Sequence, residues 1–524
     1  MRLLRTIAGL QTYLESRGEG ITVGFVPTMG ALHKGHASLI ERAAAETDLV
    51  IVSIFVNPLQ FNPAEDLSKY PRALQADCQL CEDWRVEIVF APAPEEMGMV
   101  THASTAAFAD TTTVLPPVAM TECLCGAFRP GHFQGVATIV TKLFEIVKPH
   151  VSYFGEKDWQ QLAIIRALVK DLNLGVEIRG CPTVREISGL AYSSRNQYLT
   201  PEEKGRATRI YRGLQKAQEA FLHGETNSAG LIAIVERELQ QDRGFKVQYV
   251  QLVHPETLEP LPDIGVAGGV LAVAVYVGST RLIDNLFLRQ RQFIIAIDGP
   301  AGAGKSTVTR LVARELGLMY LDTGAMYRAL TWLVLRSGIH VDDEIAIAEL
   351  VSLSRIELIP GQDETDPTTV KINGEDVTLA IRTPEVTKSV SPVSAQKCVR
   401  RVLVKQQRQL GQGGGIVMEG RDIGTNVFPE AELKIFLTAS VSERAKRRSR
   451  DLIAQGRQNI RLEQLEKDIQ SRDEFDSHRP LAPLKKAFDA IEVNTDGLTV
   501  AEVTAKIVSL YQQRHQLLSP KTSP

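Results

Sequence analysis

The feature that most constrains the fold is an apolar stretch that runs into a glycine-rich turn at residues 295–307, IAIDGPAGAGKST. This segment satisfies the pattern G-x-x-x-x-G-K-[ST], which binds phosphate when a strand precedes it and a helix follows. Its glycines let backbone N–H groups close around phosphate oxygens, and the helix N-terminus adds positive potential. We therefore predict an α/β unit with a phosphate-binding loop; a glycine-rich turn without a ligand is the minor alternative.

The residues of this loop have distinct expected roles. Lys305 reaches the terminal phosphates of ATP as a catalytic residue, and the Ser306 hydroxyl ligates Mg²⁺. The expected ATP-binding set of this half is Gly299, Pro300, Ala301, Gly302, Ala303, Gly304, Lys305, Ser306 and Thr307.

Length requires more than one domain, because 524 residues exceed the size at which one hydrophobic core keeps growing. The 59 basic and 62 acidic side chains nearly balance, which argues against a nucleic-acid partner. The sequence has no apolar run of about 20 residues and no signal-peptide pattern at its start, so we expect a cytoplasmic protein without a membrane partner. The six cysteines lack the spacing of a zinc site and are expected to be reduced thiols, with zinc a minor alternative.

A second strand–turn–helix segment opens the first half at residues 23–35. Strand-like runs then alternate with helical periodicity, which predicts a mainly parallel, doubly wound sheet. The expected strands are 49–55, 87–91, 151–154 and 271–277, and the expected helices are 133–147 and 160–171. The domains predicted from this pattern are 1–290, with a Rossmann-like part to about 182 and a smaller lobe from about 183, and 291–524, with a disordered tail at about 516–524.

The second half resembles the bacterial cytidylate kinase family over nearly all of residues 293–513. The resemblance rests on the blocks LDTGAMYR (321–328), INGEDV (372–377), IRT (381–383), EGRDIGT (419–425) and RDEFDSHRP (472–480). It implies a P-loop nucleoside monophosphate kinase domain that transfers a phosphoryl group from ATP to CMP or dCMP. A kinase that also serves uridylate is an open alternative.

Carried over by position, the resemblance implies a binding site for the acceptor nucleotide. It places Arg328, Arg421 and Arg479 at the acceptor phosphate, Ser391, Arg400 and Asp422 at the cytosine edge, Arg472 and Asp476 at the sugar, and Thr323 and Tyr327 in the same site. A carboxylate such as Asp422 accepts a hydrogen bond from the cytosine amino group, whereas uracil presents a carbonyl there.

A basic run, Arg444, Lys446, Arg447, Arg448 and Arg450, follows a strand that is expected to end near Phe436. It could form a lid that closes on ATP, or it could be a solvated helix face, and the two interpretations are about equally weighted. A nucleic-acid surface is less consistent with it, because no aromatic residues are interleaved.

The first half offers the pattern H-x-G-H, His33-Lys34-Gly35-His36, at the turn after its first long strand. Alone this pattern is weak, since paired histidines are often packing or surface residues. Its surroundings resemble pantothenate synthetase, a nucleotidyltransferase family, from about residue 1 to residue 285. The blocks are FVNPLQF (55–61), RPGHFQGV (129–136), FGEKDWQQ (154–161), SSRN (193–196) and RLIDN (281–285).

This second resemblance implies that pantoate is adenylated by ATP and that β-alanine then displaces AMP. It implies catalytic roles for His33, His36, Lys157 and Arg195, with His36 favoured for proton donation or charge stabilisation, and pantoate binding by Gln60 and Gln161. The implied ATP site is Met29, Gly30, Ala31, Leu32, His33, Lys34, Gly35, His36, Gly155, Glu156, Lys157, Asp158, Val184, Tyr192, Ser193, Ser194 and Arg195. The family also implies a homodimer through this half.

Two positions depart from the family pattern. Ser188 stands where an aspartate is usual, and Tyr192 replaces an aliphatic residue. Both adjoin the expected site, so they bear on the geometry near Ser193. The main alternative function is that one half is catalytically silent and acts as a regulatory or interaction module.

Overall fold

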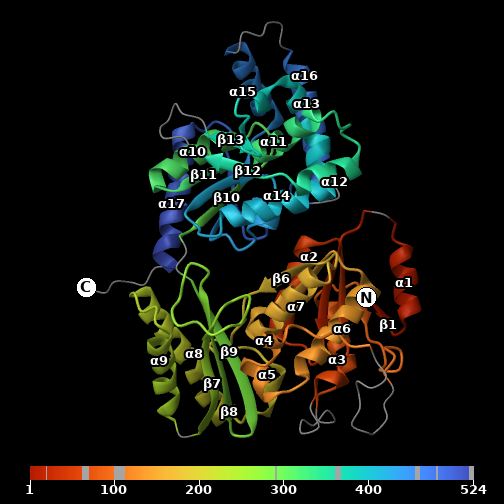
Figure 1. The fold of residues 1–524 in the computed structure, drawn as a ribbon, viewed down its shortest axis with the longest axis vertical. Coiled ribbons are helices and arrows are strands. Elements are labelled where there is room, and N and C mark those ends of the chain that lie inside the picture. The colour runs from red at the N-terminus through yellow and green to blue at the C-terminus, as the bar shows by residue number, and fades with distance from the viewer. Residues whose placement is uncertain are drawn as a thin grey trace. The chain divides into compact units, whose positions relative to one another are not determined.

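A computed structural model describes residues 1–18, 20–61, 70–99, 112–242, 244–289, 292–359, 368–454, 461–478 and 482–518. The chain divides into two compact units, Met1–Gln290 and Arg291–Pro524, which we call the N-terminal and C-terminal units. Figure 1 shows that each unit contains β-sheets with helices packed against them.

The N-terminal unit contains a six-stranded sheet in the order β1-β4-β3-β2-β5-β6, with every neighbouring pair parallel. Its strands are β1 (Arg2–Leu4), β2 (Val23–Thr28), β3 (Leu49–Ile54), β4 (Ile88–Phe90), β5 (Val151–Gly155) and β6 (Glu177–Cys181). The main helices are α1 (Ile7–Glu15), α2 (Lys34–Glu46), α3 (Leu74–Asp83), α6 (His132–Val147) and α7 (Trp159–Asp171). The expected doubly wound α/β sheet is thereby confirmed.

Both faces of this sheet are buried, which explains its apolar strands. All six residues of β3 are buried, and they alternate between two core clusters. Leu49 and Ile51 pack with α6, whereas Val50 and Val52 pack with α2. Parallel strands that helices cover on both faces have sequences of continuous apolar residues, as these strands do.

After β6 the chain leaves this sheet and forms a smaller lobe. Helices α8 (Pro201–Leu222) and α9 (Ser228–Gln240) lie along one face of a separate sheet of β7 (Phe245–Val253), β8 (Gly269–Val277) and β9 (Thr280–Leu288) (Figure 1). This sheet is antiparallel, so the expectation that 271–277 continues the parallel alternation is wrong. Only Gly278 and Ser279 connect β8 to β9, and a two-residue turn joins antiparallel strands only.

The C-terminal unit has a five-stranded parallel sheet in the order β11-β15-β10-β16-β17. Its strands are β10 (Ile294–Asp298), β11 (Met319–Asp322), β15 (Ile416–Gly420), β16 (Leu433–Thr438) and β17 (Ile491–Asn494). Its helices are α10 (Lys305–Leu316), α11 (Thr323–Arg336), α12 (Glu344–Ser352), α13 (Pro384–Ala395), α14 (Lys397–Leu410), α15 (Val441–Ala454), α16 (Leu462–His478) and α17 (Val500–Leu518). A small antiparallel sheet of β12 (Ile356–Ile359), β13 (Thr369–Ile372) and β14 (Glu375–Asp376) carries the INGEDV block.

Two expectations in this unit need adjustment. Strand β16 extends to Thr438 rather than ending near Phe436. Helix α17 continues to Leu518, so the first part of the tail expected to be disordered is helical, and residues 519–524 lie outside the described part of the chain. No helix in the described ranges is long and apolar enough to cross a membrane.

Candidate functional sites

The first candidate site begins where β2 turns into α2. His33 caps the helix, and its Nδ1 accepts a hydrogen bond from Gly35 N at 3.1 Å. His36 Nδ1 accepts from His33 N at 3.3 Å, and the two rings lie 4.1 Å apart. Because Nδ1 is the acceptor in both neutral rings, the proton of each lies on Nε2, which can donate to a ligand.

Burial keeps both histidines neutral. It lowers the pKa of His33 to about 4, with the Lys157 charge as the second cause, and it lowers the pKa of His36 to about 3, with His33 as the second cause. Of the two roles expected for His36, proton donation and charge stabilisation, this state supports only the second at neutral pH. In this state the ring can act as a neutral N–H donor.

We expect the resonances of His33 and His36 to remain those of neutral imidazole from pH 8 down to about 5.5. Their folded pKa values lie below the unfolded value of 6.5, so their contribution to stability is complete above pH 6.5 and is lost as pH falls through about 4 and about 3. NMR titration of the ring protons in the full chain measures this. A midpoint near 6.5 for either ring would contradict the neutral-donor assignment.

Asp77 holds the loop in front of these histidines, and the sequence analysis missed it. Its buried carboxylate reaches from α3 and accepts from Ala31 N at 2.9 Å and Leu32 N at 2.8 Å. Gly30 and Ala31 both have positive φ, so the loop adopts a conformation that needs such support. Asp77 lies outside every motif block, and only the fold brings it to this loop.

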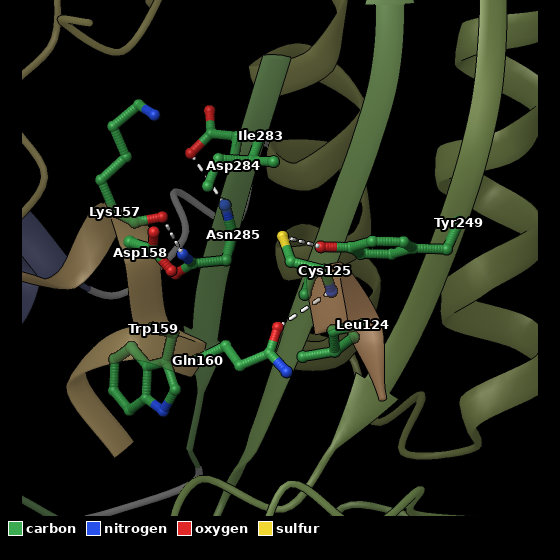
Figure 2. A pocket seen from close by; sticks show the side chains of 11 residues that line it. Leu124, Cys125, Lys157, Asp158, Trp159, Gln160, Tyr249, Ile283, Asp284 and Asn285 are labelled. Carbon is green, nitrogen blue, oxygen red and sulfur yellow. Dashed lines mark hydrogen bonds between the residues drawn. The ribbon is translucent and has the colours of Figure 1, made fainter. Parts of the chain in front are cut away.

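Lys157 lies on the 3₁₀ turn η3 (Glu156–Asp158) at the end of β5, and burial lowers its pKa. Asn285 of β9 donates from Nδ2 to Lys157 O at 2.8 Å (Figure 2). The same Nδ2 donates to Glu156 O at 2.9 Å. In Figure 2 the Lys157 ammonium extends away from Tyr249 and Cys125, which line the same pocket. The smaller lobe thus fixes the turn that presents Lys157, which gives the RLIDN block a structural role.

The segment between the sheet and α8 completes this site. Tyr192 N donates to Val184 O at 3.0 Å, and the Tyr192 ring stacks on His33 with ring centroids 6.3 Å apart. Ser193 caps the 3₁₀ helix η4 (Ser194–Tyr198), and the Arg195 charge contributes to lowering the pKa of Lys157, after burial. The departure at Tyr192 therefore places an aromatic ring against His33, whereas Ser188 lies in the turn of this segment and accepts weakly from Leu190 N at 3.5 Å.

The two glutamines expected to bind pantoate have different surroundings. Gln60 is buried, its Nε2 lies 2.8 Å from Met29 Sδ, and its Oε1 accepts from Asn57 Nδ2 at 3.2 Å. His132, from the RPGHFQGV block, lies 2.8 Å from Gln60 O through its Nδ1. Gln161 is half-buried on the first turn of α7, where its N–H donates to Asp158 at 3.2 Å.

The second candidate site is the loop between β10 and α10. Gly299 is required there, because a Cβ would meet Leu437 O at 2.1 Å. Lys305 Nζ donates to Gly299 O and Pro300 O, each at 2.8 Å, and burial, followed by the Arg421 charge, lowers its pKa to about 7. Anionic phosphates that approach Lys305 would raise its pKa and favour the protonated ammonium.

Glu419 faces the phosphate loop from the end of the neighbouring strand β15. Its Oε2 accepts from Ser306 Oγ at 2.9 Å, and burial, followed by the Asp322 charge, raises its pKa. Glu419 begins the EGRDIGT block but received no role in the sequence analysis. Its position at the end of the strand next to β10 is the signal that could have identified it.

Several expected acceptor-site residues lie together. Arg421 Nε is 3.1 Å from Asp476, Arg328 donates to Thr387 at 3.0 Å, and Arg400 forms a buried ion pair with Asp422. Thr323 Oγ1 donates to Glu419 O at 2.7 Å. Ser391 lies on α13, one turn before Ser394, whose carbonyl accepts from Arg400. Tyr327 lies beneath the Arg400 guanidinium, and Arg479 falls outside the described residues.

Positive charges gather in this cluster and act on one another. Burial is the largest cause that lowers the pKa of Arg472, followed by the Arg421 charge. The Arg328 and Arg448 charges lower this pKa further. Burial also lowers the pKa of Arg328. Buried guanidinium groups that repel one another are stabilised by a bound anion, and a phosphate supplies several acceptor oxygens.

The basic run on α15 is neither a lid nor a solvated helix face along its whole length. Arg444 is buried, pairs with Asp473 at 2.5 Å and donates to Ala301 O of the phosphate loop at 3.1 Å. Arg447 donates to Thr495 Oγ1 at 3.0 Å. Lys446, Arg448 and Arg450 are exposed, and Arg448 is close enough to act on the acceptor cluster.

Comparisons with known proteins match both halves. Residues 2–287 match the family Pantoate-beta-alanine ligase, and residues 295–513 match the family Cytidylate kinase. Proteins described as bifunctional pantoate ligase/cytidylate kinase are 60% identical in Synechocystis sp. and 56% identical in Nostoc sp., in both cases over 98% of this chain and 99% of the relative. A crystal structure of pantothenate synthetase from Thermus thermophilus is 44% identical, with a TM-score of 0.51, over 55% of this chain and 100% of that one.

Proposed function

This chain belongs to the bifunctional pantoate ligase/cytidylate kinase family, and we propose that the two candidate sites, one in each unit, carry the two activities. The N-terminal unit is a pantoate–beta-alanine ligase and the C-terminal unit is a cytidylate kinase. Intact phosphate-binding features in both units favour two active sites over a silent half.

In the ligase reaction, a pantoate carboxylate oxygen attacks the α-phosphorus of ATP, and pyrophosphate leaves. The β-alanine amine then attacks the carbonyl carbon of the adenylate, loses a proton, and AMP departs. The neutral His33 and His36 donate to phosphate oxygens as negative charge develops there, and Lys157 and Arg195 neutralise that charge. Amide groups suit pantoate, since its hydroxyls need acceptors and its carboxylate needs donors, and Gln60 and Gln161 supply both.

The observation that carries the ligase proposal is the convergence of separate segments on one site. His33 and Lys157 follow β2 and β5, which are neighbouring parallel strands, and the Lys157 charge lowers the pKa of His33. Tyr192, from a third segment, stacks on the same ring. A phosphate placed among them would meet N–H donors and a positive charge together.

In the kinase reaction, an oxygen of the CMP phosphate attacks the γ-phosphorus of ATP in line with the departing ADP. Little covalent work falls to the protein, so positioning and charge stabilisation dominate. Lys305 and the loop N–H groups hold the donor phosphates. Arg328 and Arg421, with Arg479 from outside the described residues, hold the acceptor phosphate, and Arg472 and Asp476 hold the sugar. Asp422, which forms an ion pair with Arg400, is proposed to accept a hydrogen bond from the cytosine amino group.

Mg²⁺ fits the oxygen groups beside the phosphate loop. The Ser306 hydroxyl and the Glu419 carboxylate are in contact, and hard oxygen ligands are those that Mg²⁺ prefers. We propose that Ser306 would hold Mg²⁺ and that Glu419 would lie beside the ion. Bound there, Mg²⁺ would neutralise phosphate charge. No group of three or more histidine, cysteine or acidic side chains with metal-site geometry occurs among the described residues.

Ser306→Ala is expected to raise the Mg²⁺ concentration for half-maximal kinase activity about tenfold, because it removes one oxygen ligand worth on the order of 1.4 kcal/mol. The ligase Mg²⁺ dependence in the same preparation should not change. Mg²⁺ titrations of both activities measure this. An unchanged kinase requirement would remove Ser306 from metal binding.

We also propose that the chain acts in the cytoplasm as a homodimer that associates through the ligase unit. The support for the dimer is the resemblance to pantothenate synthetases, and the support for the compartment is that both reactions draw on the cellular ATP pool.

A further inference from the structure

Asp298 is the last residue of β10 and directly precedes the phosphate loop, but its side chain serves a different segment. Its carboxylate is 4% exposed. Oδ1 accepts from Ile423 N at 2.8 Å, and Oδ2 accepts from Gly424 N at 2.7 Å. Both oxygens are thus engaged by consecutive backbone N–H groups distant in the sequence.

Those N–H groups open an unusual turn. Residues Ile423–Val427 form a single π-helical turn, η6, and turns of this kind are rare and concentrate at functional sites. The first N–H groups of any helix lack partners within it, so a buried turn needs acceptors from elsewhere. Asp298 supplies two of them.

The η6 turn also holds Asp422 in place. Asn426 N donates to Asp422 O at 2.9 Å, and Asn426 Nδ2 donates to Asp422 Oδ2 at 3.0 Å. Arg400 contacts the same carboxylate oxygen. The direction of the Asp422 carboxylate therefore depends on the turn that Asp298 anchors.

We propose that Asp298 is a positioning residue for recognition of the acceptor base, because it ties the strand of the phosphate loop to the turn that orients Asp422. This rests on the proposed contact between Asp422 and cytosine. Asp298 lies one residue outside the ATP-binding loop and acts through the backbone of η6. Burial raises its pKa to about 6, opposed by the two N–H groups, so an assay at pH 8 examines the ionised acceptor.

The first test is Asp298→Asn in the full chain. The amide has nearly the same shape but offers one acceptor oxygen, and its NH₂ group faces the other N–H. The ratio of kcat/KM for CMP to that for UMP should fall about tenfold, as expected for loss of one buried hydrogen bond. The KM for ATP should change less than twofold, and ligase activity should stay at the wild-type level.

Two further variants separate positioning from general damage. Ile297→Val disturbs packing at the same strand end and should leave the CMP/UMP ratio unchanged. Asn426→Ala approaches the link from the other side, since it removes the Nδ2 donor of the η6 turn to Asp422 Oδ2, and it should lower the ratio. If Asp298→Asn does not fold in the kinase unit, an unchanged ratio in Asn426→Ala would show that the turn does not orient Asp422 and would overturn the proposal.

A double variant links the effect to Asp422. In an Asp422→Ala background, Asp298→Asn should lower the CMP/UMP ratio no further. An unchanged ratio for Asp298→Asn, an equal loss with CMP, UMP and ATP, or full additivity with Asp422→Ala would overturn the proposal. If Asp422→Ala alone leaves the ratio unchanged, the assumed base contact itself fails, and this outcome is distinguishable from failure of Asp298 alone.

Discussion

Lys305→Met should lower the kcat/KM of the kinase about a thousandfold, the size typical of removing one charge that stabilises phosphoryl transfer. Lys305 is buried at the start of α10, and burial lowers its pKa to about 7. The phosphates of ATP bring further negative charge to this ammonium and favour its charged form. Methionine has a similar length and fills the same space, so the variant removes charge and hydrogen bonds with little change in packing.

The second enzyme on the chain is the control for this experiment. ADP formation from ATP and CMP is measured beside pantothenate formation in one preparation of Lys305→Met. Ligase activity should equal that of the wild type, since Lys305 belongs to the other compact unit. Kinase activity within tenfold of the wild type would show that Lys305 does not stabilise the transferred phosphoryl group.

His36→Ala should lower the kcat of the ligase about 10²–10³-fold, which is typical when one preorganised donor to developing charge is lost. His36 faces His33 within the first turn of α2, and its Nδ1 is occupied by His33 N. The remaining Nε2–H is the donor that alanine removes. Single-turnover release of pyrophosphate from ATP and pantoate measures the step directly.

His36→Gln distinguishes a neutral donor from a proton donor. Glutamine offers an N–H at a similar reach, and at the third helical position it also preserves the capping box that His33 and His36 form. A neutral hydrogen-bond role therefore predicts that His36→Gln keeps most of the activity that His36→Ala loses. Equal loss in both variants would instead indicate that His36 must transfer a proton.

Local patterns predicted those parts of the fold that depend on neighbouring residues. Both strand–turn–helix openings appear as expected, because an apolar run, a glycine turn and a helical period lie within a short stretch of sequence. The prediction that β8 belongs to the parallel sheet was wrong, because its apolar run is compatible with a parallel or an antiparallel sheet. The two-residue Gly278-Ser279 turn was the available signal for an antiparallel partner.

The supporting groups of the two sites could not be predicted in this way. Asp77, Asn285 and Asp298 all act by holding backbone groups of distant loops, and such contacts exist only after the chain has folded. The neutral state of His36 likewise follows from burial, which its motif does not specify. Asn285 and Asp298 lie within quoted blocks and Asp77 lies outside them, but in no case does the local pattern specify which distant backbone groups the side chain holds.

The central claim is that one chain carries two working active sites, and a nucleotide-product assay on the purified full chain tests it most directly. One reaction contains ATP, pantoate and β-alanine, and the other contains ATP and CMP, both with Mg²⁺. We predict AMP, pyrophosphate and pantothenate in the first and ADP with CDP in the second. If either reaction yields no product while the other proceeds, the silent unit is not an enzyme and its assigned site is wrong.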